Sequence, residues 1–177
     1  EQGQAYTNPD ALGSAWFVKG IQWAKDPAAE MNALTTLNAK DTAVMNLANQ
    51  KSMSGLNGYD SAASIKLVSK SNDVLQYQAN TKNTQLAVFS EIYYSDGWNC
   101  YIDGKKTDKI FRANYILRGA MIPAGKHSIT WKFEPVSFKK ASGYSMIGSL
   151  LLLLSLGLVV GKECRSRIAS KNATSEK

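Results

Sequence analysis

Short segments in which apolar and polar residues alternate follow one another through the middle of the chain. Such alternation places apolar side chains on one face of a β-strand, as Ile129, Trp131 and Phe133 do in the last segment. Gly, Asn, Asp and Pro residues separate the segments, and Asp103-Gly104 is a strong signal for a two-residue hairpin turn. The pattern predicts strands in residues 63–69, 74–79, 85–94, 98–102, 115–122 and 128–133.

Many short strands with frequent turns are typical of a mainly β domain, either a sandwich or a barrel. We expect an antiparallel β-sandwich of the jelly-roll or carbohydrate-binding-module kind over residues 43–138. Residues 1–42 form an N-terminal segment in which 15–23 has the pattern of a strand. Asp26 before Pro27 is typical of a helix start, and the short helix that follows would present Met31, Leu34 and Leu37 on one side.

The C-terminal part contains an apolar run that is long enough to cross a bilayer. Residues 143–161 carry no charge and include seven Leu, one Ile and two Val. A helix of this length covers about 28 Å, close to the ~30 Å hydrocarbon core of a membrane. No polar stripe interrupts the run, as it would in a helix at the surface of a soluble protein. We therefore predict a transmembrane helix over 143–161, close behind the sandwich and followed by a basic tail, 162–177.

The charge of the chain is concentrated around this helix. The formal net charge is +7, of which residues 1–138 contribute +2 and residues 139–177 contribute +5. This distribution argues against a nucleic-acid partner, which would require basic side chains clustered on the folded domain. Because positive residues favour the cytoplasmic side, the sequence predicts a membrane protein with residues 1–138 outside and the tail in the cytoplasm.

The chain has little of the equipment of a catalytic or metal site. Two Cys and one His exclude a disulfide scaffold and the usual Cys/His zinc site. We expect Cys100 to be a small packing residue on a strand and His127 to lie in the turn before the last strand. The carboxylates are scattered, so we predict no catalytic residue, no metal and no cofactor in this chain. Because the chain begins with Glu1 and not Met, we expect it to be part of a longer protein.

A stretch dense in Tyr, Trp, Asn and Arg lies between residues 93 and 118. Aromatic rings stack on sugar faces, and amides and guanidinium groups bind hydroxyls, so the stretch would suit carbohydrate recognition. The alternative is that the aromatic side chains fill the core and its rim, where Tyr and Trp are common. The candidate residues are Trp98, Tyr101, Asn114, Tyr115 and Arg118.

The same part of the chain resembles the C-terminal end of the bacterial YfhO family of membrane proteins. The likeness extends over nearly the whole chain and is most specific in residues 89–138. Its points are Tyr94-x-x-Gly97-Trp98, Ile102-Asp103-Gly104-Lys105, Ala113-Asn114-Tyr115, Arg118, Pro123-Ala124-Gly125-Lys126-His127 and Phe133-Glu134-Pro135. Upstream, Asn8-Pro9-x-Ala11-Leu12-Gly13 and Ala15-Trp16-Phe17 are also similar to that family.

The resemblance implies that the chain is the last extracytoplasmic domain and final helix of a polytopic protein of the bacterial cytoplasmic membrane. Members of the family are regarded as glycosyltransferases of the GT-C type, which use a lipid-linked sugar to modify envelope glycopolymers. The catalytic carboxylate of such enzymes lies in an early loop, so no catalytic residue is carried over to this chain. The implied partners are the bilayer, neighbouring helices of the parent protein, and an envelope glycan or polyprenyl-linked sugar. The alternative is a non-catalytic, membrane-tethered module that binds carbohydrate or serves as an envelope scaffold.

Overall fold

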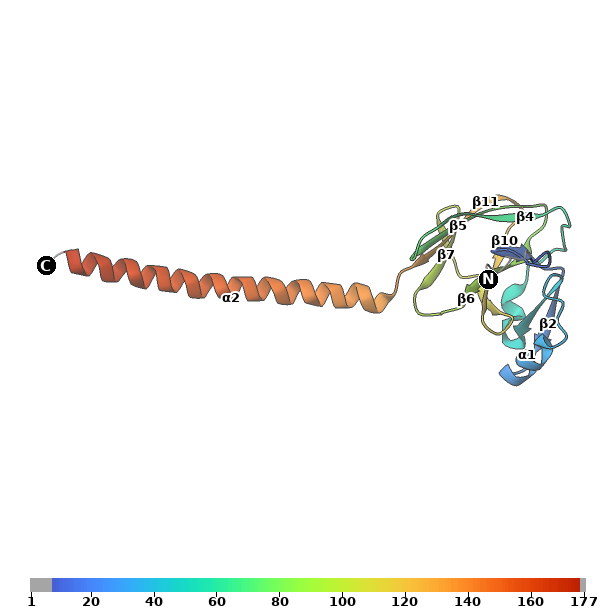
Figure 1. Ribbon diagram of the computed structural model, residues 1–177, viewed down its shortest axis with the longest axis horizontal. Coiled ribbons are helices and arrows are strands. Elements are labelled where there is room, and N and C mark those ends of the chain that lie inside the picture. Colours follow the sequence, from blue (N-terminus) through green and yellow to red (C-terminus); the bar gives the residue numbers. More distant parts are fainter. Residues whose placement is uncertain (1–7, 176–177) are drawn as a thin grey trace, which may run out of the picture. The chain divides into compact units, whose positions relative to one another are not determined.

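The structure, a computed structural model, describes residues 8–175 in two compact units. The first unit ends at Glu134 and contains all the strands, together with one short helix (Figure 1). The second begins at Pro135 and is a single helix, α2 (Val136–Ser175).

The first unit is built from two sheets that lie face to face (Figure 1). In sheet order, the six-stranded sheet consists of β1 (Ala15–Phe17), β6 (Gln85–Ile92), β10 (Leu117–Ile122), β9 (Ile110–Ala113), β3 (Thr42–Asn46) and β2 (Gly20–Ala24). The five-stranded sheet consists of β4 (Ser64–Lys70), β5 (Val74–Thr81), β11 (Gly125–Phe133), β7 (Trp98–Ile102) and β8 (Lys105–Thr107). This arrangement confirms the predicted mainly β sandwich, and each of the six predicted segments contains a strand.

The N-terminal segment is part of the sandwich. The single strand predicted over 15–23 is in fact two strands, β1 and β2, which lie at opposite edges of the six-stranded sheet. The pair of β2 and β3 is parallel, whereas every other paired set of strands in the described chain is antiparallel. A parallel pair needs a crossover connection, and helix α1 (Pro27–Leu34) supplies it.

Helix α1 begins as the sequence predicts, because the Asp26 side chain accepts a hydrogen bond from the Ala29 backbone N–H at 2.8 Å. The face that it buries is different from the predicted one. Met31 is 50% exposed, whereas the Glu30 side chain is 1% exposed. The carboxylate of Glu30 accepts two hydrogen bonds from Arg112 Nη2, at 3.0 and 3.1 Å, and one from Asn46 at 3.1 Å. An ion pair, and not an apolar stripe, therefore fixes this helix on the sheet.

The main core lies between the two sheets and is built around Phe89 of β6. The ring of Phe89 makes edge-to-face contacts with Tyr77 at 4.9 Å and with Trp131 at 5.3 Å, measured between ring centres. All three rings are almost completely buried. The predicted packing role of Cys100 is confirmed, since it is fully buried in the same cluster.

A second core covers the outer face of the six-stranded sheet. Alternate residues of β6 point to the two faces, so Phe89 enters the main core while Leu86 and Val88 enter the second. Met53, from the short 3₁₀ turn η2 (Lys51–Met53) that follows η1 (Leu47–Asn49), lies against this outer face. Because both cores lie within residues 15–131, the first unit contains the buried apolar surface that it needs to fold by itself.

The β7–β8 hairpin has the turn that its sequence predicts. Asp103 and Gly104 have φ values of 50° and 79°, the left-handed pair that a two-residue turn of this type requires. Asp103 Oδ1 accepts the Ser128 backbone N–H at 2.9 Å, and Asp103 Oδ2 lies 2.6 Å from Nδ1 of His127. The other ring nitrogen of His127 lies 3.1 Å from the Ala124 carbonyl oxygen. Both partners are acceptors, so the doubly protonated imidazolium satisfies both contacts.

Helix α2 contains the apolar stretch predicted to cross a membrane. Within the described residues it is the one helix long and apolar enough to do so, with the candidate span at Tyr144–Lys162. Its leucines are exposed and not packed into a protein core, as a lipid-facing helix requires. The hydroxyls of Ser149 and Ser155 donate to the backbone carbonyls of Ser145 and Leu152, which satisfies them without water. The backbone stays helical to Ser175, through most of the predicted basic tail.

Phe89→Ala should lower the free energy of unfolding of the domain by about 3–5 kcal/mol, because it leaves a cavity between Tyr77 and Trp131. Urea denaturation of residues 8–134 measures this change. Met31→Ala is the control, since its side chain is half exposed and its loss should change the unfolding free energy by less than about 0.5 kcal/mol. A similar loss for both variants would contradict the description of the core.

The Asp103 carboxylate raises the pKa of His127 above its ordinary value of about 6.5. In turn, His127 lowers the pKa of Asp103. The histidine contribution to stability is full below pH ~6.5 and is lost as the pH rises through the raised pKa. The aspartate contribution is full above pH ~4 and is lost as the pH falls through the lowered pKa. The turn is therefore most stable between these two limits.

A proton NMR titration tests this directly, because the chain has a single histidine. We expect His127 to titrate above pH ~6.5 in the native domain and closer to it in Asp103→Asn, a change that a left-handed turn tolerates. The difference in melting temperature between the two proteins should shrink as the pH rises from about 6 to about 9, because His127 then loses its proton and the ion pair with Asp103 is lost. An unshifted His127 would refute the proposed ion pair.

Candidate functional site

Two of the predicted carbohydrate-binding residues, Trp98 and Arg118, join the two sheets. The Arg118 side chain is 3% exposed, and its guanidinium carbon lies 3.9 Å from the centre of the Trp98 ring and 5.3 Å from that of Trp131. Its Nε donates to the Ile92 carbonyl oxygen at 2.8 Å. Burial lowers the pKa of Arg118, and the aromatic faces replace part of the lost hydration. This pair has a structural explanation, and its role in sugar binding stays a prediction.

Tyr101 lies on the other face of β7. Trp98 and Cys100 point inward, so Tyr101, one residue further along the strand, points outward. Its hydroxyl donates to Glu134 Oε2 at 2.6 Å, and this bond raises the pKa of Tyr101. Because the period of a strand is two residues, Trp98 and Tyr101 cannot line the same surface.

Asn114 and Tyr115 form a turn on the six-stranded sheet, and not the beginning of a strand. Both residues have left-handed backbones, with φ values of 47° and 69°. The buried side chain of Asn114 accepts the Val44 backbone N–H at 2.8 Å, and the Asn114 N–H donates to the Val44 carbonyl at 2.8 Å. The ring of Tyr115 lies 5.4 Å from the guanidinium carbon of Arg112. The structure thus distributes the five predicted residues over three separate places.

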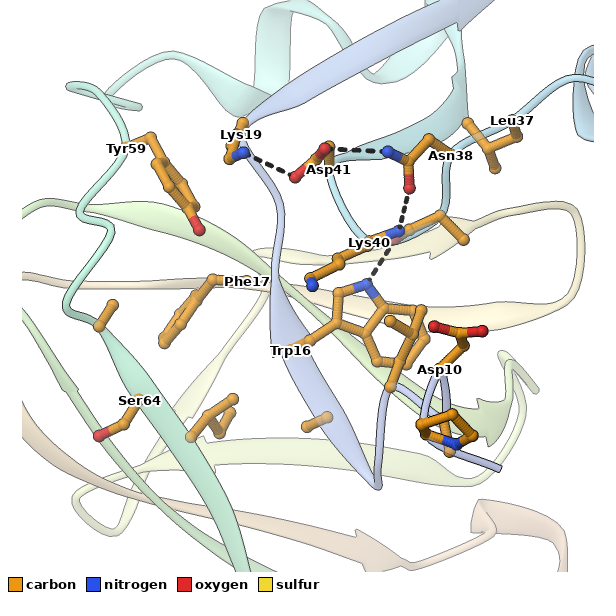
Figure 2. A pocket seen from close by; sticks show the side chains of 17 residues that line it. Asp10, Trp16, Phe17, Lys19, Leu37, Asn38, Lys40, Asp41, Tyr59 and Ser64 are labelled. Atoms are coloured by element: carbon orange, nitrogen blue, oxygen red, sulfur yellow. Dashed lines mark hydrogen bonds and ion pairs between the residues drawn. The ribbon is translucent and has the colours of Figure 1, made fainter. Parts of the chain in front are cut away.

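A hollow lies elsewhere on the domain, along the edge strand β1. This β1 cleft has a volume of about 730 Å³ and is bounded by three segments besides β1, residues 9–12, 37–41 and 59–65 (Figure 2). It is lined by Pro9, Asp10, Ala11, Leu12, Ala15, Trp16, Phe17, Lys19, Leu37, Asn38, Ala39, Lys40, Asp41, Tyr59, Ala63, Ser64 and Ile65.

An ion pair stands at one side of the β1 cleft. Lys19 Nζ lies 2.8 Å from Asp41 Oδ1, and Asn38 Nδ2 donates to Asp41 Oδ2 at 2.9 Å (Figure 2). The hydrogen bond with Lys19 lowers the pKa of Asp41, and the same contact raises the pKa of Lys19. An ammonium group carries three N–H donors and a carboxylate about four acceptor sites, so the pair can also bind a ligand's hydroxyl groups.

The loop that carries Asp41 is fixed by its own hydrogen bonds. The Asp41 carbonyl accepts the backbone N–H groups of Lys19 and Gly20, at 2.7 and 3.0 Å. Asn38 Oδ1 accepts the Lys40 N–H at 3.2 Å, and the Asn38 carbonyl accepts the Thr42 N–H at 2.9 Å. The polar groups of the β1 cleft therefore stand in defined positions without a ligand.

Aromatic side chains supply the other walls. Figure 2 shows Trp16 and Phe17 on opposite sides of β1, as neighbours on a strand must be. Trp16 Nε1 donates to the Ala39 carbonyl at 2.8 Å, which fixes the indole ring against the loop. Tyr59, which is exposed, lies with its ring centre 5.7 Å from Lys19 Nζ. The cleft thus combines ring faces with fixed donors and acceptors.

No local sequence pattern indicates this cleft, because its lining comes from four segments that meet only in the folded chain. Its charged residues balance, with Lys19 and Lys40 against Asp10 and Asp41. Within residues 8–175, no group of three or more His, Cys, Asp or Glu side chains is placed to hold a metal ion. The arrangement is suited to binding an uncharged polar ligand.

A family model described as "Bacterial membrane protein YfhO" matches residues 31–143. The match runs from helix α1 through the sandwich to the start of the apolar stretch of α2. No curated protein and no solved structure matches the chain. The chain belongs to the YfhO family of bacterial membrane proteins, and its candidate span accounts for its association with the lipid bilayer.

Trp98→Ala should lower the free energy of unfolding by about 2–4 kcal/mol, because it removes a large ring and uncovers a buried guanidinium. Tyr101→Phe should leave the unfolding midpoint nearly unchanged, since it removes one hydrogen bond at the water-facing side of β7. Chemical denaturation of both variants in residues 8–134 provides the comparison. A Trp98→Ala domain as stable as the native one would show that this ring is not part of the framework.

Proposed function

We propose that the sandwich is an extracytoplasmic accessory domain of a membrane glycosyltransferase of the GT-C type. On this proposal the enzyme uses a lipid-linked sugar, and the β1 cleft holds the envelope glycan that accepts it. The residues that perform the transfer belong to other parts of a longer protein. Membership of the YfhO family supports the location in a membrane, and the lining of the β1 cleft supports the proposed glycan binding.

The observation that carries the proposal is the combination of rings and fixed polar groups in the β1 cleft. Sugars present apolar ring faces and hydroxyl groups that both donate and accept hydrogen bonds. Trp16 and Tyr59 offer aromatic surface for the first, and the Lys19–Asp41 pair offers donors and acceptors for the second. Because these polar groups are already positioned, binding costs little ordering of the protein.

The charge of the cleft restricts the kind of glycan. Two basic and two acidic side chains line it, so it offers no net attraction to a polyanion. A neutral sugar segment fits this balance better than a phosphate-bearing one.

The charge around the span supports an extracytoplasmic sandwich. Lys162, Arg165, Arg167 and Lys171 follow the apolar stretch on the side away from the sandwich. Positive residues are retained in the cytoplasm, so this distribution favours a sandwich on the outer side, where lipid-linked sugars meet envelope polymers.

Tyr59→Ala and Asp41→Asn should each weaken binding of neutral envelope oligosaccharides by about 3- to 10-fold, the loss expected for one stacking contact or one hydrogen bond. Isothermal titration calorimetry with residues 8–134 measures the affinity. Tyr94→Ala is a matched control, because Tyr94 is also an exposed tyrosine but does not line the β1 cleft. Equal affinities for all four proteins would refute glycan binding in the cleft.

The same variants in the full-length protein separate the transferase from a tethered binding module. If the parent protein is a transferase, Asp41→Asn should raise KM for the acceptor and leave kcat nearly unchanged, because the cleft binds substrate without touching the reacting atoms. Glycan binding without any transfer from a lipid-linked donor would instead support the module.

A further inference from the structure

Four strand ends come together where the chain leaves the sandwich. Ile92 of β6 pairs with Leu117 of β10, and Trp98 of β7 pairs with Phe133 of β11. The guanidinium of Arg118, which covers the Trp98 ring at 3.9 Å, connects these two pairs across the sandwich. We call this end of the domain the exit end, because β11 continues from it toward α2.

The exit end exposes an unusual group of apolar side chains. Ile92 is 67% exposed, Tyr94 is 53% exposed and Ile116 is 51% exposed. The Tyr93 backbone N–H donates to the Ile116 carbonyl at 2.7 Å, which holds the two turns side by side, and a hollow of about 400 Å³ lies at them. Apolar groups gathered in this way commonly mark an interaction surface. Ile92, Tyr94 and Ile116 are called the exit-end patch below.

The backbone under the patch is firmly held. Arg118 Nε donates to the Ile92 carbonyl at 2.8 Å, and the Ile116 N–H donates to the Asn114 carbonyl at 2.8 Å. Asn114 is itself tied to Val44 by two hydrogen bonds of 2.8 Å. The folded domain therefore keeps these side chains exposed to water unless a partner covers them. Exposure of apolar surface to water is unfavourable, so a covering partner would be favoured.

The chain itself brings a partner of suitable chemistry. β11 ends at Phe133 and the candidate membrane span begins at Tyr144. The intervening residues 134–143 reach no further than about 35 Å even when fully extended. The exit end is thus tethered close to a bilayer, so even weak contacts with lipid are favoured by a high effective concentration.

We propose that the exit-end patch is a lipid-contacting surface. Ile92 and Ile116 enter the boundary between headgroups and acyl chains, where aliphatic side chains partition favourably, and Tyr94 lies at headgroup level, where Tyr is enriched in membrane proteins. Since none of the three side chains is charged, the contact depends on apolar burial and is insensitive to salt.

The test uses the full chain reconstituted in phosphatidylcholine vesicles and an environment-sensitive fluorophore on one engineered cysteine. Cys164→Ser removes the competing thiol of α2. Cys100 stays unlabelled, because burial raises its pKa to about 12 and keeps it a protected thiol. The label is placed at the patch in Ile92→Cys and at a control position in Tyr59→Cys. The control position lies far from the patch along β6: Tyr59 precedes Asp60, whose backbone N–H donates to Gln85 Oε1 at 3.2 Å, and Gln85 is at the other end of β6 from Ile92.

Lipids that carry a nitroxide near the headgroup should quench the label at residue 92 and leave the label at residue 59 unchanged. Iodide in the aqueous phase should quench the label at residue 59 more than the label at residue 92. The extent of quenching by the nitroxide lipid should not change with salt concentration. Equal quenching by lipid at both positions, or at neither, would overturn the proposal. In the isolated domain, residues 8–134, carrying the same label and without lipid, protection of residue 92 from iodide by soluble envelope oligosaccharide would assign the patch to sugar and also overturn the proposal.

A second arm removes the patch itself. With the label on Ser95→Cys, the triple variant Ile92→Ser, Tyr94→Ser, Ile116→Ser should reduce quenching by the nitroxide lipid to the level seen at residue 59. Circular dichroism shows whether the triple variant folds, and Ile116→Ser alone replaces it if it does not. Undiminished lipid quenching in the folded variants would show that the patch does not make the contact.

Discussion

A continuous column of aromatic rings and one buried cation holds the two sheets together. The ring of Phe89 contacts those of Tyr77 and Trp131 edge to face, and the guanidinium of Arg118 lies against the rings of Trp131 and Trp98. Because the column crosses from one sheet to the other, it fixes their separation at the centre and at the exit end. The charge is tolerated in the core because ring faces and the Ile92 carbonyl replace part of its hydration.

This column explains why a stretch rich in aromatic and polar residues need not be a binding site. Trp98 and Arg118 form part of the framework, and Asn114 serves the backbone of β3 through Val44. Each is of a residue type that binds sugars, but the Trp98 ring face, the Arg118 Nε and the Asn114 amide oxygen already contact other groups of the domain. The β1 cleft differs because the Lys19–Asp41 pair is exposed to solvent and retains donors and acceptors.

Local patterns predicted what depends on neighbouring residues and missed what depends on distant ones. The turn at Asp103, the alternation of the strands and the apolar span were predictable, because each follows from a few consecutive residues. The buried Glu30 was not, since its partner Arg112 lies 82 positions away in the sequence. The parallel pair of β2 and β3 and the four-segment lining of the β1 cleft were missed for the same reason. Tertiary contacts, not propensities, decide these features.

The two proposed surfaces are linked by the direction of β1. This strand pairs with β6 from Ala15 opposite Phe89 to Phe17 opposite Ala87, and β6 continues from Phe89 to Ile92 at the exit end. A glycan lying along the edge of β1 would therefore have one of its ends directed toward the exit end. A lipid-linked donor is confined to the membrane surface, so an acceptor must approach that surface in a defined direction. A domain free to rotate on its connection would lose that direction, whereas lipid contact at the exit end would preserve it. On the two proposals, glycan binding and lipid contact would be separate interactions, and accurate delivery of an acceptor would require both.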